Sequence, residues 1–185
     1  MSKSVIAPAL SLLLVAALAG CASSTASKPA AKPAEKKPSG ITAQLAPTEA
    51  NGTVKGDIKF VQRDGNVLVS GTIKGLPPKT WHGFHVHENG SCADKGNAAG
   101  GHFNPTGKPH GAHGVGEHHV GDMPPLYADS KGEAAVDITS TSLALSGPNS
   151  IIGKAVIVHE KDDDVTAQPA GNAGARIACG IVTSN

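Results

Sequence analysis

Short runs of β-forming residues, each closed by a turn signal, recur through most of this 185-residue chain. The clearest pair, residues 57–61 and 67–73, flanks Arg63-Asp64-Gly65-Asn66, and an Asp-Gly turn between two such runs is typical of a β-hairpin. No stretch keeps the 3.6-residue apolar period of a helix. Further runs lie at 83–87, 134–138, 151–159 and 176–182. We therefore expect an all-β sandwich or barrel over residues 41–185, a length that can bury its own core.

The first forty residues differ from this pattern. Lys3 precedes a short, mostly apolar run at 5–19 that Pro8 interrupts, which is typical of an export signal and too short for a membrane span. The run ends in Leu18-Ala19-Gly20-Cys21, which resembles the bacterial lipobox, where the cysteine is acylated and becomes the new N-terminus. The alternative is an ordinary cleavage site with an incidental cysteine. We expect a signal peptide at 1–20.

The segment after the signal peptide is expected to be a tether. Residues 22–40 are mainly Ala, Ser, Lys and Pro, with almost no apolar surface to bury. The conformational entropy lost on ordering them would therefore not be offset by burial. We therefore expect a lipidated Cys21 and a flexible linker at 21–40. Several acyl chains on one cysteine would anchor the chain firmly to a membrane.

Charge and aromatic content exclude one class of partner. The whole chain is close to neutral, at a formal charge of +1, and only 3% of its residues are aromatic. Five of the sixteen basic residues but one of the fifteen acidic residues precede Ile41, so the expected domain is slightly acidic. Neither bulk positive charge nor base-stacking platforms are available, and we expect no nucleic-acid partner.

Histidines concentrate in one part of the chain. Seven of the nine lie between His85 and His119, mostly in the Gly-rich, strand-poor stretch 89–125. His85 and His87 alternate on an expected strand and so share one face. A loop of this length needs something to organise it, and a metal held by imidazoles can do so. Three histidines and one aspartate suit tetrahedral zinc; the alternative, a metal-scavenging tract, fits poorly with the irregular spacing.

Two further signals lie elsewhere. His159 ends an expected strand and precedes several carboxylates, which suits a metal ligand oriented by a neighbouring acid. Apart from Cys21, the cysteines are Cys92 and Cys179. An exported protein with two remaining cysteines most simply forms one disulfide, the alternative being two free thiols.

Together these segments resemble the copper/zinc superoxide dismutases. The resemblance covers essentially all of residues 41–185 and rests on the wording and order of five motifs: Gly-Phe-His-Val-His-Glu at 83–88, Gly-His-Phe-Asn-Pro at 101–105, His-Val-Gly-Asp at 119–122, Val-His-Glu at 158–160 and Gly-Asn-Ala-Gly-Ala-Arg-Ile-Ala-Cys-Gly at 171–180. It implies an eight-stranded Greek-key flattened barrel, or sandwich, with long metal-binding loops. It also implies an enzyme that converts superoxide to dioxygen and hydrogen peroxide. The additional residues at 93–100 and 111–116 resemble the bacterial exported branch.

The resemblance implies one copper and one zinc ion per subunit. The copper ligands would be His85, His87, His102 and His159, and the zinc ligands His102, His110, His119 and Asp122. His102 would therefore bridge the two metals and carry a catalytic proton. His119 is preferred to His118 because only His119 keeps the 119–122 motif in register. We assign no metal role to His82, His113 or His118.

Three other roles follow from the resemblance. Arg176 would be the catalytic arginine that holds the superoxide anion, because charge-assisted hydrogen bonds suit that task. Asp163 would link a copper ligand to a zinc ligand. Cys92 and Cys179 would form the family's disulfide.

The chain departs from the family in one loop. Residues 165–170 carry no charge, whereas eukaryotic relatives have a longer charged loop there that helps to guide the superoxide anion. We hypothesise that Lys95 takes over part of this electrostatic steering.

Three alternative functions fit the sequence less well than the enzyme does. A copper chaperone or buffer on the same scaffold would typically have lost copper ligands or the arginine. A structural lipoprotein would not explain His159 and Arg176, and a copper-only enzyme would not need His110, His119 and Asp122. We expect a location in the bacterial envelope, anchored in the membrane by lipid. The periplasmic side of the outer membrane is favoured over the inner membrane because Ala22 follows Cys21. Whether the chain forms a homodimer is left open.

Overall fold

The computed structural model describes residues 40–184. The expected signal peptide, Cys21 and most of the expected linker lie outside the described residues. None of the helices among residues 40–184 has the length and apolarity needed to span a bilayer. The described elements are β1 (Ile41–Pro47), β2 (Lys55–Arg63), β3 (Asn66–Lys74), β4 (Trp81–His82), β5 (Phe84–His87), the 3₁₀ turn η1 (Asn97–Ala99), β6 (Leu126–Tyr127), β7 (Glu133–Ser140), β8 (Ala155–His159) and β9 (Arg176–Ser184).

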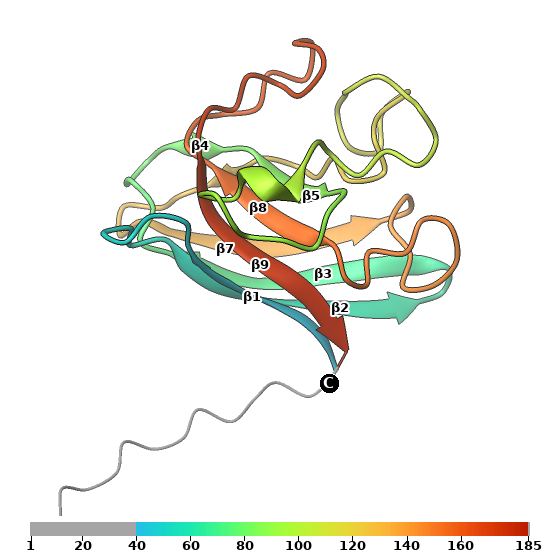
Figure 1. Ribbon diagram of the computed structural model, residues 1–185, viewed down its shortest axis with the longest axis horizontal. Helices are drawn as coiled ribbons and strands as arrows, with labels where there is room; N and C mark the ends of the chain where they lie inside the picture. The colour runs from blue at the N-terminus through green and yellow to red at the C-terminus, as the bar shows by residue number, and fades with distance from the viewer. Residues whose placement is uncertain (1–39, 185) are drawn as a thin grey trace, which may run out of the picture. The chain divides into compact units, whose positions relative to one another are not determined.

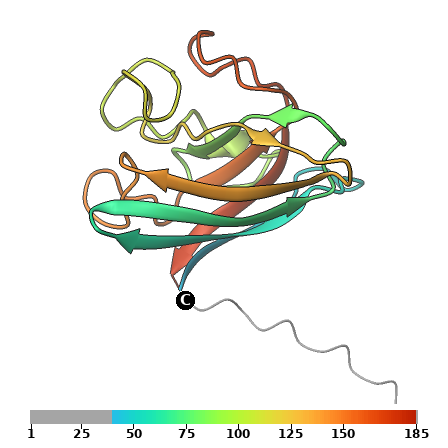
Figure 2. The same ribbon diagram turned by 180° about the vertical axis from the view of Figure 1, so that it is seen from behind.

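The expected all-β fold is confirmed. Seven antiparallel strands form one curled sheet in the order β5-β8-β9-β1-β2-β3-β7, and β4 and β6 form a separate two-stranded ribbon. The curl carries β5 and β8 over the layer made by β1, β2, β3 and β7 (Figures 1 and 2). Apolar side chains from both parts fill the space between them and form the core, with Ile58, Phe60, Val69, Phe84, Val86 and Val156 among the most deeply buried.

The hairpin between β2 and β3 lies where the sequence predicts it. Arg63 pairs with Asn66 across a two-residue turn, and both turn residues, Asp64 and Gly65, have positive φ angles of 50° and 84°. Such a turn matches the right-handed twist of the flanking strands. Alternate residues of β2 point into the core, so the strand is buried at every second position near its centre.

Two expected strands are shorter than predicted, and three observed strands were not predicted. The run at 151–159 becomes a strand only at Ala155, because residues 151–154 form a turn closed by the Lys154 N–H donating to the Ile151 carbonyl. The run at 83–87 forms β5 from Phe84 onward. The unpredicted strands are β1 and the short β4 and β6.

The long strand-poor stretch is confirmed. Between β5 and β6 the structure describes one regular element, η1, together with isolated bridges to β5. In Figures 1 and 2 the loop around residues 105–118 and the loop between β8 and β9 project at the same end of the sheet. The described chain begins at the other end, because Ile41 pairs with Ser184 at the far end of β9 from Arg176.

Candidate metal centre

Three of the candidate ligands come from two paired strands. All four residues of β5 are buried, and the alternation of the strand puts His85 and His87 on one face. β8 pairs with β5 through Phe84 and Val158, so His159, the last residue of β8, lies beside the strand that carries His85 and His87. Regular hydrogen bonding thus fixes the main chain of these three histidines without any help from the loops.

Loop segments add the remaining ligands along the free edge of β5. The Glu88 N–H donates to the Gly101 carbonyl at 2.9 Å, and the Val86 N–H donates to the Gly121 carbonyl at 2.8 Å. These bonds form single bridges that set His87 opposite His102 and His85 opposite Asp122. Gly121 has to be glycine, because a Cβ there would lie 2.2 Å from the Val86 carbonyl oxygen.

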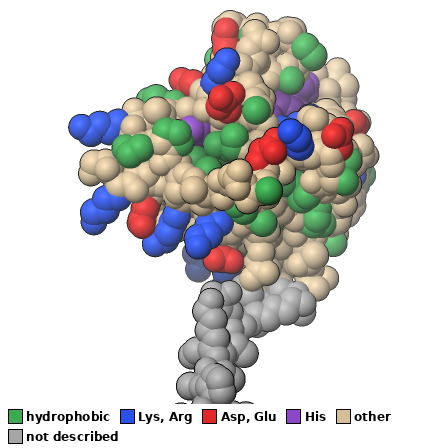
Figure 3. Space-filling model, turned by 60° about the vertical axis from the view of Figure 1, so that its left-hand side comes forward, with side chains coloured by type: hydrophobic (Ala, Val, Ile, Leu, Met, Phe, Trp, Pro, Cys, Tyr) green, Lys and Arg blue, Asp and Glu red, His purple; other side chains and the backbone are tan. Residues whose placement is uncertain are grey.

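The structure brings all seven candidate ligands into two buried groups. Within each group, one ligand atom from each side chain lies within 4.8 Å of the others; the groups are His85, His87, His102 and His159, and His102, His110, His119 and Asp122. His102 belongs to both groups, as the resemblance implies. On the face drawn in Figure 3 only small patches of histidine reach the surface, consistent with this burial.

The spacing of the nitrogens fits metal ions. His87 Nε2 lies 3.3 Å from His159 Nε2, and His102 Nδ1 lies 3.4 Å from His119 Nδ1. Two nitrogens bound to one tetrahedral ion at the usual zinc–nitrogen bond length lie about 3.4 Å apart. Four imidazoles suit copper, and three imidazoles with a carboxylate suit zinc.

Unpaired polar atoms point to the same conclusion. His85 Nδ1 and His102 Nε2 are buried without a hydrogen-bond partner. Buried polar atoms are almost always paired, because leaving one unpaired costs free energy. The orphaned nitrogens therefore fit a site in which metal ions are the missing partners.

The electrostatics differ between the two groups. On the copper side, burial lowers the pKa of His85 to about 4 and that of His159 to about 3, so both rings are neutral near pH 7 and offer lone pairs. On the zinc side, burial acts against the charged form of His110, but contacts with Asp122 and Asp163 outweigh it and raise its pKa to about 9. Burial likewise raises the pKa of Asp122, yet the contacts with His102 and His110 lower it overall.

Asp163 lies where the resemblance places it, between the two groups. One of its carboxylate oxygens is 3.1 Å from His85 Nε2, and the other is 3.2 Å from His110 Nε2. Both contacts use the ring nitrogen that faces away from the metal group. Gly171 packs directly against this carboxylate, since a Cβ there would lie 1.7 Å from an Asp163 oxygen.

The three histidines without an assigned metal role lie outside both groups. His82 is buried and its Nδ1 donates to the His159 carbonyl at 2.8 Å. His113 Nδ1 donates to the Asp122 carbonyl, and His118 Nδ1 donates to the His119 carbonyl. All three support the main chain of a ligand rather than joining the ligand set.

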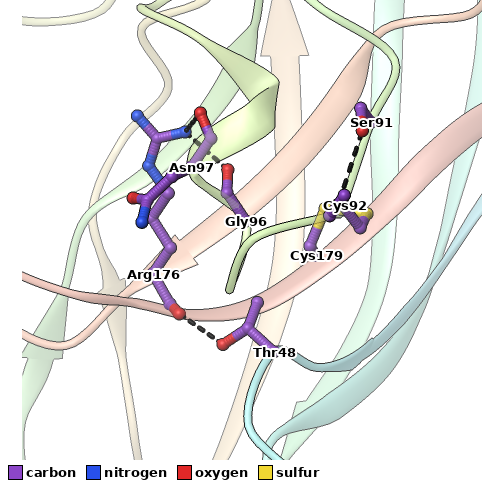
Figure 4. The surroundings of a disulfide bond; sticks show 8 residues. Thr48, Ser91, Cys92, Gly96, Asn97, Arg176 and Cys179 are labelled. Atoms are coloured by element: carbon purple, nitrogen blue, oxygen red, sulfur yellow. Dashed lines mark hydrogen bonds between the residues drawn. A yellow bond between two sulfur atoms is a disulfide. The ribbon is translucent and has the colours of Figure 1, made fainter.

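Arg176 begins β9 opposite His159 in the β8–β9 register. Its Nη1 donates to the Gly96 carbonyl and its Nη2 to the Gly100 carbonyl, each at 2.6 Å, with a longer bond from Nη1 to Asn97. Figure 4 shows the guanidinium against the segment that carries η1. Thr48 Oγ1 donates to the Arg176 carbonyl on the other side.

The expected disulfide is confirmed. Cys92 and Cys179 are bonded, which joins the loop that precedes η1 to β9 three residues after Arg176 (Figure 4). The disulfide and the arginine thus connect the same loop to the same strand.

Lys95 has a partner that the sequence does not predict. Its Nζ lies 2.8 Å from Glu49 Oε1, and both side chains are more than half exposed. The two residues are 46 positions apart, so no local sequence signal identifies the pair. The positive charge proposed for steering is therefore offset by a carboxylate beside it.

Comparisons with known proteins agree with this site. Residues 54–182 match the family model described as copper/zinc superoxide dismutase (SODC). The chain is 41% identical over 150 residues to "Superoxide dismutase [Cu-Zn] 2" of Mesembryanthemum crystallinum, covering 77% of this chain and 96% of the relative. It is 44% identical over 146 residues to the protein of the same name from Brassica juncea, covering 75% and 95%. It is 43% identical over 141 residues to "Extracellular superoxide dismutase [Cu-Zn]" of Brugia pahangi, covering 71% and 70%.

A solved structure is similar as well. The structure described as "Crystal Structure Analysis of the clock protein EA4" superposes with a TM-score of 0.72 at 39% identity, covering 82% of this chain and 98% of the other.

Proposed function

This chain belongs to the copper/zinc superoxide dismutase family, and from that premise we propose that it removes superoxide in the bacterial cell envelope, attached to a membrane by a lipid on Cys21. It is an enzyme of the copper/zinc type. The observation that supports its activity best is the convergence of four buried histidines beside a guanidinium held in place by backbone carbonyls. A chaperone or buffer that only stores metal has no need of that guanidinium.

We assign copper to His85, His87, His102 and His159, and zinc to His102, His110, His119 and Asp122. Copper, when bound, supplies a one-electron couple that zinc lacks, so that one superoxide is oxidised to dioxygen and a second is reduced, with two protons, to hydrogen peroxide. The zinc ligands fix the loop around His110 and hold the shared ring of His102 through its Nδ1.

Arg176 binds the anion in this proposal. A guanidinium has five N–H donors, and three are used for the carbonyls of Gly96, Asn97 and Gly100. The donors left over can hold superoxide by charge-assisted hydrogen bonds. Because the carbonyls fix the plane of the guanidinium, the anion is positioned without further ordering of the side chain.

His102 moves the proton. Its Nδ1 lies 2.8 Å from Asp122 Oδ1, while its Nε2 faces the other group and is buried without a hydrogen-bond partner. The Nε2 atom can therefore hold a proton and pass it to the reduced anion. Burial keeps bulk water from competing for this transfer.

The proposed location rests on the first forty residues. Leu18-Ala19-Gly20-Cys21 supports lipidation of Cys21 after removal of residues 1–20, and the composition of 22–40 supports a linker between the lipid and the 41–185 domain. Ala22 favours the periplasmic side of the outer membrane. Superoxide is an anion and crosses membranes poorly, so an envelope pool needs an enzyme of its own.

Two experiments test the proposal. The first tests the anchor. The full chain expressed in bacteria should incorporate radiolabelled palmitate and sediment with outer-membrane fractions, whereas the Cys21→Ser variant should be unlabelled and soluble. Equal fractionation of the two proteins would contradict the anchor.

The second experiment tests the activity. The full chain loaded with copper and zinc should catalyse superoxide decay near the diffusion limit, and the chain loaded with zinc alone should not. Stoichiometric copper binding without catalysis would favour the chaperone or buffer.

A further inference from the structure

Residues 165–170, the uncharged part of the loop between β8 and β9, contact the zinc side of the site through Gln168. The side-chain amide of Gln168 forms two hydrogen bonds with the main chain of His110: the His110 N–H donates to Oε1 at 2.9 Å, and Nε2 donates to the His110 carbonyl at 2.8 Å. The two residues are 58 positions apart. This pairing imitates the way in which one strand binds the next.

His110 depends on this pairing for its main chain. It lies in a segment without helix or strand, and within residues 40–184 the hydrogen bonds to its backbone N–H and carbonyl both come from Gln168. The copper-side histidines differ, because β5 and β8 fix the main chain of His85, His87 and His159. His110 therefore has no support from a sheet.

The loop that carries Gln168 is built to present it. The Asp164 N–H donates to the Gly171 carbonyl at 2.9 Å, and the Gly171 N–H donates to the Ala167 carbonyl at 2.8 Å, so the loop closes on itself. Asp164 also accepts hydrogen bonds from the N–H and the hydroxyl of Thr166. The same loop contributes Asp163, whose Oδ1 lies 3.2 Å from His110 Nε2. The loop thus contacts His110 at both its ring and its main chain.

We propose that Gln168 is a positioning residue for zinc: its amide clamps the main chain of His110 and so pre-orders the zinc ligand that no strand supports. This inference rests on the zinc role proposed for His110. It gives the shortened loop a role that needs no charge. Residues that orient metal ligands from outside the ligand set typically change metal affinity by about 10–100-fold when replaced.

The test compares two replacements of Gln168 with one control in the full chain. Gln168→Met keeps the length of the side chain and loses both hydrogen bonds, and Gln168→Glu keeps the acceptor but turns a carboxylate toward the His110 carbonyl. Gln44→Met makes the same change on the exposed outer side of β1, away from both ligand groups. Zinc affinity and zinc release are measured against a chelator, and Co²⁺ bound at the zinc site reports ligand geometry through its visible spectrum.

Both Gln168 variants should bind zinc about tenfold more weakly, release it faster and show an altered Co²⁺ spectrum. The Cu²⁺ electron paramagnetic resonance spectrum of the zinc-saturated variants should match that of the unchanged chain, and Gln44→Met should match it in every measurement. Zinc affinity and Co²⁺ spectra that are unchanged in Gln168→Met, or in Gln168→Glu should the first variant not fold, would overturn the clamp. If the unchanged chain itself takes up no zinc, the zinc role of His110 fails instead.

Discussion

Arg176 and His87 donate hydrogen bonds to the same acceptor, the carbonyl oxygen of Gly100. Arg176 Nη2 lies 2.6 Å from this oxygen and His87 Nδ1 lies 3.0 Å from it. One backbone group thus orients both the proposed anion-binding guanidinium and a proposed copper ligand. Gly100 has a φ of 76°, and a Cβ there would lie 2.4 Å from Glu88 Oε1, so only glycine fits this position.

Gly100→Ala should therefore damage two functions at once. The new methyl group would push against Glu88 and shift the shared carbonyl, so we expect weaker copper binding and about tenfold lower catalytic efficiency, the usual effect of disturbing a metal ligand's support. Gly107→Ala is the matched control, because Gly107 also has a positive φ, 64°, but faces open space. Copper affinity and superoxide decay measured on both variants check this; equal activity in the two would contradict the shared-acceptor account.

Arg176→Lys should lower activity although the charge is retained. A lysine ammonium cannot hold the carbonyls of Gly96 and Gly100 in a fixed plane and still present two donors to an anion. Hydrogen bonds to charged groups contribute about 1.5–3 kcal/mol, so we expect roughly a 10–100-fold loss in kcat/KM. Pulse radiolysis measures the rate, and the Cu²⁺ spectrum should remain close to that of the unchanged protein. A fully active lysine variant would show that charge alone suffices.

The pair between Lys95 and Glu49 modifies the steering hypothesis. Glu49→Gln removes the carboxylate that offsets Lys95 and should raise the rate roughly twofold at low ionic strength, whereas Lys95→Gln exposes the carboxylate and should lower it by a similar factor. Both effects should vanish in high salt because the two side chains are exposed. Rates measured across a salt series decide the matter; if both variants follow the unchanged chain at every salt concentration, neither residue steers the anion.

Zinc binding should release a proton near neutral pH. The raised pKa of His110, about 9, means that the ring is charged in the metal-free protein at pH 7.5, and zinc requires the neutral ring. Because this pKa lies above the ordinary value of 6.5, the stabilisation it contributes to the metal-free protein is complete below pH 6.5 and is lost as pH rises through 9.

Titration calorimetry in buffers of different ionisation enthalpy measures this proton. We expect about one proton released per zinc at pH 7.5 from His110 and none from it at pH 10. Asp163→Asn removes one of the two carboxylates that raise the pKa and should reduce the release at pH 7.5. No difference between pH 7.5 and pH 10 would mean that the ring is already neutral.

Most of the candidate ligands lie in short local motifs, and the family resemblance of those motifs is what singles them out; His110 lies outside the motifs. His85 and His87 alternate on a strand, and His119 and Asp122 keep a fixed spacing, so neither pair requires knowledge of the fold. The supporting contacts behave differently. Gln168 reaches His110, and Lys95 reaches Glu49, across large separations that only the closed sheet and its loops bring together.

Strand boundaries show the same limit. Ile151 begins an apolar run that predicts a strand. The residue is fully buried, but it lies in a turn that packs on the core. The sequence does not predict β1, because its place as a central strand depends on pairing with both β2 and β9. Tertiary pairing, rather than local propensity, decides such segments.

The most direct test of the account is a crystal structure of the copper- and zinc-loaded protein, with anomalous differences recorded on either side of the copper and zinc absorption edges. We expect one copper between His85, His87, His102 and His159, and one zinc between His102, His110, His119 and Asp122, with the ring of His102 between the two ions. Copper at the aspartate-containing group, or a second ion that does not contact His102, would contradict the assignment of the two sites.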